Sequence, residues 1–142
     1  MALAFDISVL GSAEIERKLG NLAVKVQRKV MRKAMRKAAK PILETAKSLV
    51  PVDEGKLRRS LKIRALKRRR GSFGVQVKTG TRDELGIAPD DPYYYPMAVE
   101  TGTNKVAARP YLRPALKLNR TESLNILARE LKAGIAREAR TG

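Results

Sequence analysis

Carboxylates are the side chains on which a catalytic or metal-binding interpretation of this chain would depend. The sequence holds neither His nor Cys, so it lacks the commonest general base, the commonest metal ligand and any thiolate nucleophile. A nuclease or hydrolase would have to use acids as general acids or Mg²⁺ ligands. The candidates are Asp53, Glu54, Asp83, Glu84, Asp90, Asp91 and Glu100. Most lie in segments rich in Gly and Pro, which favours solvated turns, and we predict no catalytic residue, metal site or cofactor.

Cationic side chains form the second group with chemical potential, because the formal net charge is +17. Most of this charge lies in the first 80 residues, whereas residues 81–110 hold more acids than bases. Such a field attracts polyanions at long range and weakens with salt. The densest run contains seven bases and no acid: Arg28, Lys29, Arg32, Lys33, Arg36, Lys37 and Lys40.

Two interpretations of this basic run stay open, a solvated helix face and a contact surface. Like charges at i,i+4 on a helix repel by a few tenths of a kcal/mol per pair, so an excess of them favours a contact surface. We therefore predict that the run binds DNA or an acidic partner. Three further bases at an expected hairpin tip are a second candidate for phosphate contact. They are Arg68, Arg69 and Arg70.

Aromatic residues do not interleave with either basic region, which disfavours stacking on single-stranded bases. Neither a helix-turn-helix nor a zinc-finger pattern is present, so sequence-specific readout is not expected. The aromatic cluster is Tyr93, Tyr94 and Tyr95. We expect at least one of these rings to pack in the core, and outward-facing ones are a candidate subunit interface.

The first element expected along the chain is a short, half-buried strand. Residues 3–9 alternate, with Phe5 and Val9 on the apolar side, as in a strand with one buried face. Gly11 ends this pattern, and Ser12 is the expected N-cap of a helix.

A long amphipathic helix with one cationic face is expected next. Apolar residues keep helical spacing from Ile15 to Leu49, and Pro51 ends the pattern. Pro41 lies inside it and favours either a kink or the start of a new helix. Because the apolar residues keep their phase across Pro41, we predict a kink.

The second half of the chain predicts a β-hairpin and a final helix. Residues 61–66 and 73–78 alternate around a basic loop, which is typical of two paired strands. Residues 79–93 show no period and predict a long loop, and residues 94–100 predict extended chain. A helix with regular Leu and Ile spacing follows Pro110 and Pro114.

These elements predict an α+β fold in which long N-terminal (kinked) and C-terminal helices pack on a small antiparallel sheet with a basic hairpin. The length of 142 residues fits one domain over residues 1–142. No segment approaches the ~20 apolar residues that cross a bilayer, and no secretory leader is apparent. We expect synthesis in a reducing cytoplasm and no membrane partner.

Three short blocks occur in a fixed order along the chain: residues 51–60 (PVDEGKLRRS), 95–103 (YPMAVETGT) and 108–115 (ARPYLRPA). With the basic helix before them and the last helix after them, they resemble the neck or tail-completion proteins of long-tailed bacteriophages, a family of minor tail and head–tail joining components. The resemblance covers about residues 20–135.

The resemblance implies a virion protein and not an enzyme. It implies a homo-oligomeric ring at the head–tail junction that contacts connector, neck and tail proteins, while genomic double-stranded DNA passes without sequence specificity through its channel. The matching structural residues are Pro51, Asp53, Gly55, Leu57, Arg58, Glu100, Gly102, Pro110 and Pro114.

Physical roles follow for several of these residues. Asp53 is expected to accept turn amides, Gly55 to adopt a positive φ, and Leu57 to anchor the hairpin in the core. Glu100, in a β-like segment, is expected to pair with Arg58 or Arg109. The alternative function, drawn from charge alone, is a non-specific nucleic-acid-binding protein that acts outside any particle.

Overall fold

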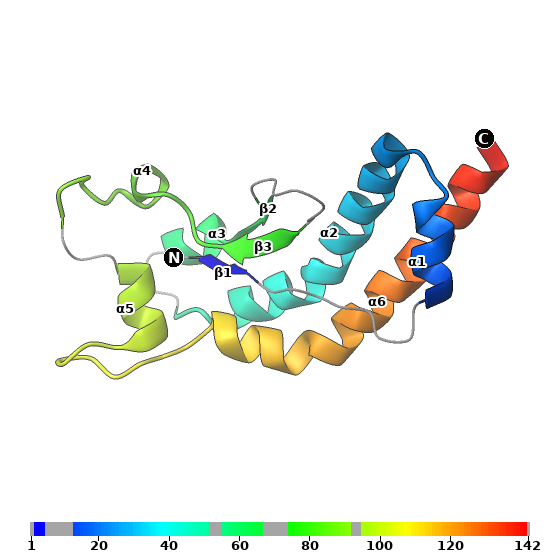
Figure 1. Cartoon of the computed structure of the whole chain (residues 1–142). Helices are drawn as coiled ribbons and strands as arrows, with labels where there is room; N and C mark the ends of the chain where they lie inside the picture. Colours follow the sequence, from blue (N-terminus) through cyan, green and yellow to red (C-terminus); the bar gives the residue numbers. More distant parts are fainter. Residues whose placement is uncertain (1, 5–12, 52–54, 67–73, 92–94, 142) are drawn as a thin grey trace.

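The computed structural model describes residues 2–4, 13–51, 55–66, 74–91 and 95–141. Six helices and three strands lie within these ranges (Figure 1). In chain order they are β1 (Ala2–Ala4), α1 (Ala13–Gly20), α2 (Val24–Leu49), α3 (Lys56–Ser60), β2 (Lys62–Ala65), β3 (Val75–Lys78), α4 (Arg82–Leu85), α5 (Tyr95–Thr101) and α6 (Leu112–Thr141).

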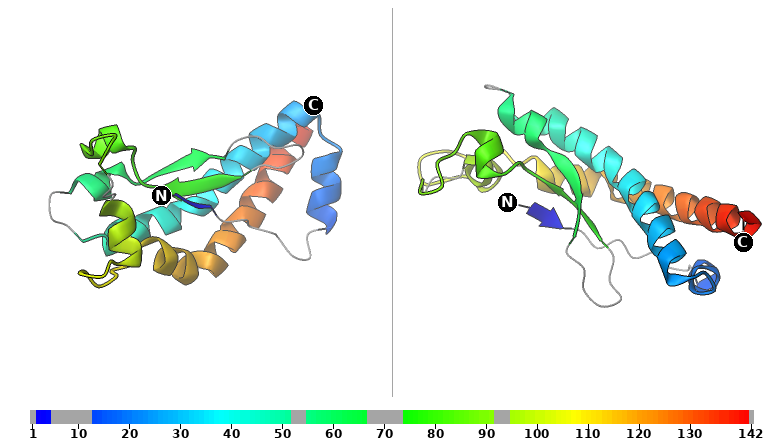
Figure 2. Two further views of the ribbon diagram at one scale, coloured as in Figure 1. Left: turned by 60° about the vertical axis from the view of Figure 1, so that its left-hand side comes forward. Right: turned by 90° about the horizontal axis from the view of Figure 1, so that it is seen from above.

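The two long helices, α2 and α6, form an antiparallel pair that runs through the molecule (Figures 1 and 2). Three polar contacts set their register. Lys29 pairs with Glu138, Lys37 with Glu130, and the Asn119 amide donates to the Thr45 hydroxyl. As the residue number rises on α2 it falls on α6, which is the signature of antiparallel helices.

Small residues let α2 and α6 approach closely. Ala34 and Ala38 of α2 are buried with Leu127 and Leu131 of α6. At Gly134 a Cβ atom would lie only 2.9 Å from Cγ1 of Val30, a separation that requires one of the two to move.

α2 continues through Pro41 without interruption, so no new helix starts there. The helix expected from Ser12 to Leu49 is nevertheless not continuous, because α1 ends at Gly20 and α2 begins at Val24. The Gln27 side-chain amide donates to the Leu22 carbonyl in this connection, at 2.8 Å. The apolar residues keep helical spacing across this break, which is why the sequence pattern predicted a single helix.

Within the described residues the sheet has three antiparallel strands in the order β1-β3-β2. Ile63 faces Val77 and Ala65 faces Val75 in the hairpin, and Leu3 pairs with Val77 on the other side. The predicted hairpin is therefore confirmed. Its tip, with Arg68, Arg69 and Arg70, lies outside the described residues, as do Ser12 and residues 5–9 of the predicted first strand.

Two segments differ from the sequence-based prediction. Within residues 79–93, predicted as loop, Thr81 starts the helical turn α4 through a capping box with Glu84. Residues 94–100 were predicted as extended chain, whereas residues Tyr95–Thr101 form α5. Pro96 fits the first turn of a helix, and the aromatic residues before it had favoured a strand.

Buried apolar residues gather in two clusters along the α2–α6 pair. One, which we call the sheet-side core, joins the second half of α2 to α3, the sheet and the start of α6. The other joins α1, the first half of α2 and the C-terminal half of α6. The fold is α+β, as predicted, with long helices on a small antiparallel sheet. None of the described helices combines the length and apolar character that a membrane-spanning helix needs.

Candidate functional site

The second and third sequence blocks meet where α5 approaches the first turn of α6. Glu100, on α5, is only 5% exposed. Its Oε2 accepts the backbone amides of Tyr111 and Leu112 at 2.7 and 2.9 Å, and its Oε1 accepts that of Arg113 at 3.0 Å. One buried carboxylate thus caps the amino end of α6, where free amides and the helix dipole favour a negative group.

A tight loop between α5 and α6 brings this carboxylate into place. Gly102 has φ +77°, and a Cβ there would lie 2.8 Å from the Ala108 amide nitrogen, so only glycine fits without strain. The Arg109 amide donates to the Val99 carbonyl at 2.8 Å. The loop is therefore closed by backbone hydrogen bonds at its base.

Tyr111 fixes the same junction from the other side. Its side chain is fully buried, and its hydroxyl donates to the Pro96 carbonyl at 3.0 Å. Leu112 and Ala115 are buried next to it in the sheet-side core. The two blocks are therefore one structural unit, here called the α5–α6 junction: residues 95–103 and 108–115.

The first block lies beside this junction. Gly55 adopts φ +73° before α3, as the sequence predicts, and Leu57 is buried in the same core cluster as Tyr111. Leu57 lies on α3, and its burial in one cluster with Val75 and Val77 of β3 agrees with the expectation that it anchors the hairpin in the core. Asp53 and its expected turn contacts fall outside the described residues.

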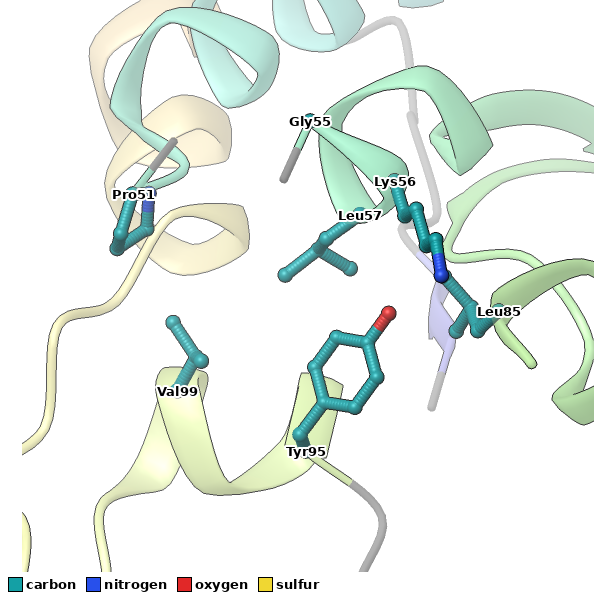
Figure 3. A pocket seen from close by; sticks show the side chains of 7 residues that line it. All are labelled: Pro51, Gly55, Lys56, Leu57, Leu85, Tyr95 and Val99. Carbon is teal, nitrogen blue, oxygen red and sulfur yellow. The ribbon is translucent and has the colours of Figure 1, made fainter. Parts of the chain in front are cut away.

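A partly open hollow of about 290 Å³ lies between α3, α4 and α5. Leu57, Tyr95 and Val99 point toward it (Figure 3). Among the described residues that line it, none carries a carboxylate; the full set is Pro51, Gly55, Lys56, Leu57, Leu85, Tyr95 and Val99. Its walls are mainly apolar, and the Lys56 amine and the Tyr95 hydroxyl are the polar side-chain groups among these described lining residues.

The candidate acids that the structure describes are not gathered into one site; Asp53 and Glu54 lie outside the described residues. Glu84 caps α4 and pairs with Lys62 of β2 at 2.6 Å, and Asp83, Asp90 and Asp91 are exposed. Hydrogen bonding to the Lys62 ammonium lowers the pKa of Glu84 below its ordinary value. No group of three or more metal-binding side chains occurs within the ranges that the structure describes.

Glu100 does not pair with Arg58 or Arg109 as expected. Its oxygens accept three backbone amides, and both arginines are exposed. A signal for this was present in the sequence: the last helix begins at Tyr111-Leu112, without the Ser, Thr, Asp or Asn that normally caps a helix. The cap therefore had to come from elsewhere in the chain.

The predicted cationic run lies on the first two thirds of α2. Six of its seven residues are exposed and Arg28 is half-buried. Lys29 and Lys37 contact glutamates of α6 at 2.9 and 3.1 Å. The sequence alone does not predict which bases of the run pair with α6 and which face outward.

The tyrosine cluster is described only in part. Tyr95 is half-buried and packs against the sheet-side core from α5, which agrees with the expectation that one ring contributes to the core. Tyr95 lies on the helix α5, and not on the extended chain that was predicted for residues 94–100. Tyr93 and Tyr94 lie outside the described residues.

Comparison with protein-family models gives one match, over residues 13–109, to a family described as "Bacteriophage HK97-gp10, putative tail-component". The match contains the cationic face, the hairpin and all of α5 with Glu100. Comparisons with curated proteins and with solved structures give no match.

Proposed function

The chain belongs to the HK97-gp10-like family of bacteriophage tail components, and we propose that it assembles as a homo-oligomeric ring at the junction of head and tail. It is thus a structural protein of the phage tail. The neck or tail-completion position, the ring and its contact with connector and tail proteins are the proposed part.

The observation that carries this proposal is the family match together with the construction of the α5–α6 junction. The side chains of Glu100 and Tyr111, together with the turn at Gly102, hold one end of the molecule rigid. Rigid, preorganised surfaces suit assembly, since less freedom is lost on association. We propose further that the chain is not an enzyme, a proposal supported by the dispersed or hydrogen-bonded state of the candidate acids within the described residues.

Location in the virion follows from the same proposal. At the head–tail junction the packaged genome has to pass, so a ring there adjoins double-stranded DNA. The high positive charge of the chain suits such a position, because it lowers the free energy of nearby phosphates.

A second candidate function is favoured by the cationic face of α2, namely non-specific nucleic-acid binding outside any particle. The two differ in their dependence on phage proteins. A free DNA binder needs only plain duplex, whereas a junction protein is required for joining heads to tails.

The test is deletion of the gene from the phage or prophage that encodes this chain. We expect electron microscopy to show separate heads and tails, and a plasmid copy of the wild-type gene to restore joined particles. The Glu122→Gln variant, at an exposed α6 position, serves as a control that should restore joining equally well. Joined, infectious particles without the gene would overturn the proposal.

A further inference from the structure

The exposed bases between residues 28 and 40 of α2 divide into two sets, one beside α6 and one facing away from it. Lys29 and Lys37 turn toward α6 and are held there by Glu138 and Glu130. Lys33 lies between them in the groove that α2 and α6 form, beside Arg137. The remaining exposed bases of the run make no ion pair with any described residue; we call them the outer row: Arg32, Arg36 and Lys40.

The outer row is regular. Its members are four residues apart, so they project from the same side of α2 at steps of about 6 Å and span roughly 12 Å. A duplex carries about one phosphate charge per 1.7 Å of its axis. Every residue of the row can therefore reach a phosphate while α2 lies against the backbone.

The composition of this face favours DNA over an acidic protein. Protein interfaces are centred on apolar and aromatic anchors, and α2 contains no aromatic residue. Its exposed apolar side chains, Val24 and Leu49, lie at its two ends. Guanidinium groups bind phosphates and carboxylates alike in a bidentate manner, so the lack of apolar anchors between the two ends of α2 decides in favour of DNA.

We propose that the outer row contacts the phosphate backbone of duplex DNA without reading its sequence, while Lys29 and Lys37 hold α2 against α6. This rests on the proposed function in one respect, that the chain lies beside packaged DNA in the virion. The contact itself is a property of the isolated chain.

The test measures binding of the full chain to a plain duplex of about 30 base pairs by fluorescence anisotropy, between about 50 and 200 mM salt. The outer-row variant is R32Q/R36Q/K40Q. Each lost phosphate contact should reduce the slope of log K against log salt by about 0.9, or about 2.7 for three. At about 0.1 M salt this is roughly a 500-fold loss of affinity.

The matched control removes the same charge from exposed α6 positions, in the variant K117Q/R120Q/R129Q. We expect its slope to fall by less than about 1, because a distant charge contributes only through the screened field. Thermal melting followed by circular dichroism verifies that both variants are folded. A scrambled duplex should bind with the same affinity.

Equal losses in the two variants would show that only net charge matters and would overturn the proposal, as would an unchanged outer-row variant. Tighter binding of wild type to polyglutamate than to the duplex would assign the face to an acidic protein instead. A deletion phage that joins heads and tails normally would reject the junction role without affecting this binding result.

Discussion

The Glu100 carboxylate accepts the Tyr111 backbone amide at 2.7 Å, and both residues are buried. This bond closes the loop that begins at Gly102 and ties α5 to the first turn of α6. The sequence block that contains Glu100 and the block that contains Tyr111 therefore form one junction, in which this carboxylate caps the start of α6.

Replacing Glu100 by Gln should destabilise the chain by about 2–4 kcal/mol. An amide group places a donor opposite backbone donors and leaves at least one buried N–H without an acceptor. The free energy of unfolding in urea measures the loss. Glu122→Gln on the exposed side of α6 is the control, with an expected change within about 0.5 kcal/mol. Equal stability of the Glu100 variant and wild type would refute the capping role.

Glycine-to-alanine changes at Gly102 and Gly20 should have opposite signs. At Gly102 the positive φ and the 2.8 Å approach to the Ala108 nitrogen should cost roughly 2–4 kcal/mol. At Gly20, in α1, a Cβ meets nothing within 4 Å, so alanine should add about 0.4–1 kcal/mol by restricting the unfolded chain. Thermal unfolding of the two variants checks this, and a stabilised Gly102→Ala protein would contradict the loop geometry.

Val30 and Gly134 should be energetically coupled. Gly134→Ala brings a methyl group against Val30 Cγ1 at 2.9 Å and should cost about 1–2 kcal/mol, despite the better helix propensity of alanine. In the Val30→Ala background the same change should cost at least about 0.5 kcal/mol less. A double-mutant cycle in urea measures the coupling, and additive effects would mean that α2 and α6 do not meet at this point.

The Lys62–Glu84 pair should make stability depend on pH in the acidic range. Hydrogen bonding to Lys62 lowers the folded-state pKa of Glu84 below its ordinary value of about 4.5. The contribution is therefore complete above that value and is lost as the pH falls through the lowered pKa. Lys62→Met should move the pKa of Glu84 up toward its ordinary value.

An NMR titration of the Glu84 side chain measures this pKa directly. Lys105→Met, in the exposed loop after Gly102, is the control and should leave it in place. A Glu84 pKa that does not rise in the Lys62 variant would show that the ion pair is absent in solution.

Local chemistry made several features of the fold predictable. Gly55 was expected to adopt a positive φ and does so, because a turn after Pro51 needs a residue without Cβ. Pro110 and Pro114 flank the start of α6 as expected, and period-two alternation located both hairpin strands. In each case the signal lies within a few residues of the structure that it specifies.

The features that escaped prediction depend on distant partners or on overlooked caps. Glu100 was expected to pair with Arg58 or Arg109, whereas folding places its carboxylate at the amino end of α6. Nothing in the local sequence distinguishes Lys29 and Lys37 from the neighbouring bases. Their ion pairs form with Glu138 and Glu130 of α6, 109 and 93 positions away in the chain. Thr81 and Glu84 have the sequence pattern of a capping box, so the helical turn α4 could have been predicted from the sequence.

Counting this protein in purified particles of its own phage by quantitative mass spectrometry tests the central claim most directly. The account predicts a fixed copy number per particle, equal to that of one small ring and unchanged after DNA is released. Finished particles that lack the protein would contradict a structural role at the head–tail junction and would leave the free nucleic-acid binder as the better account.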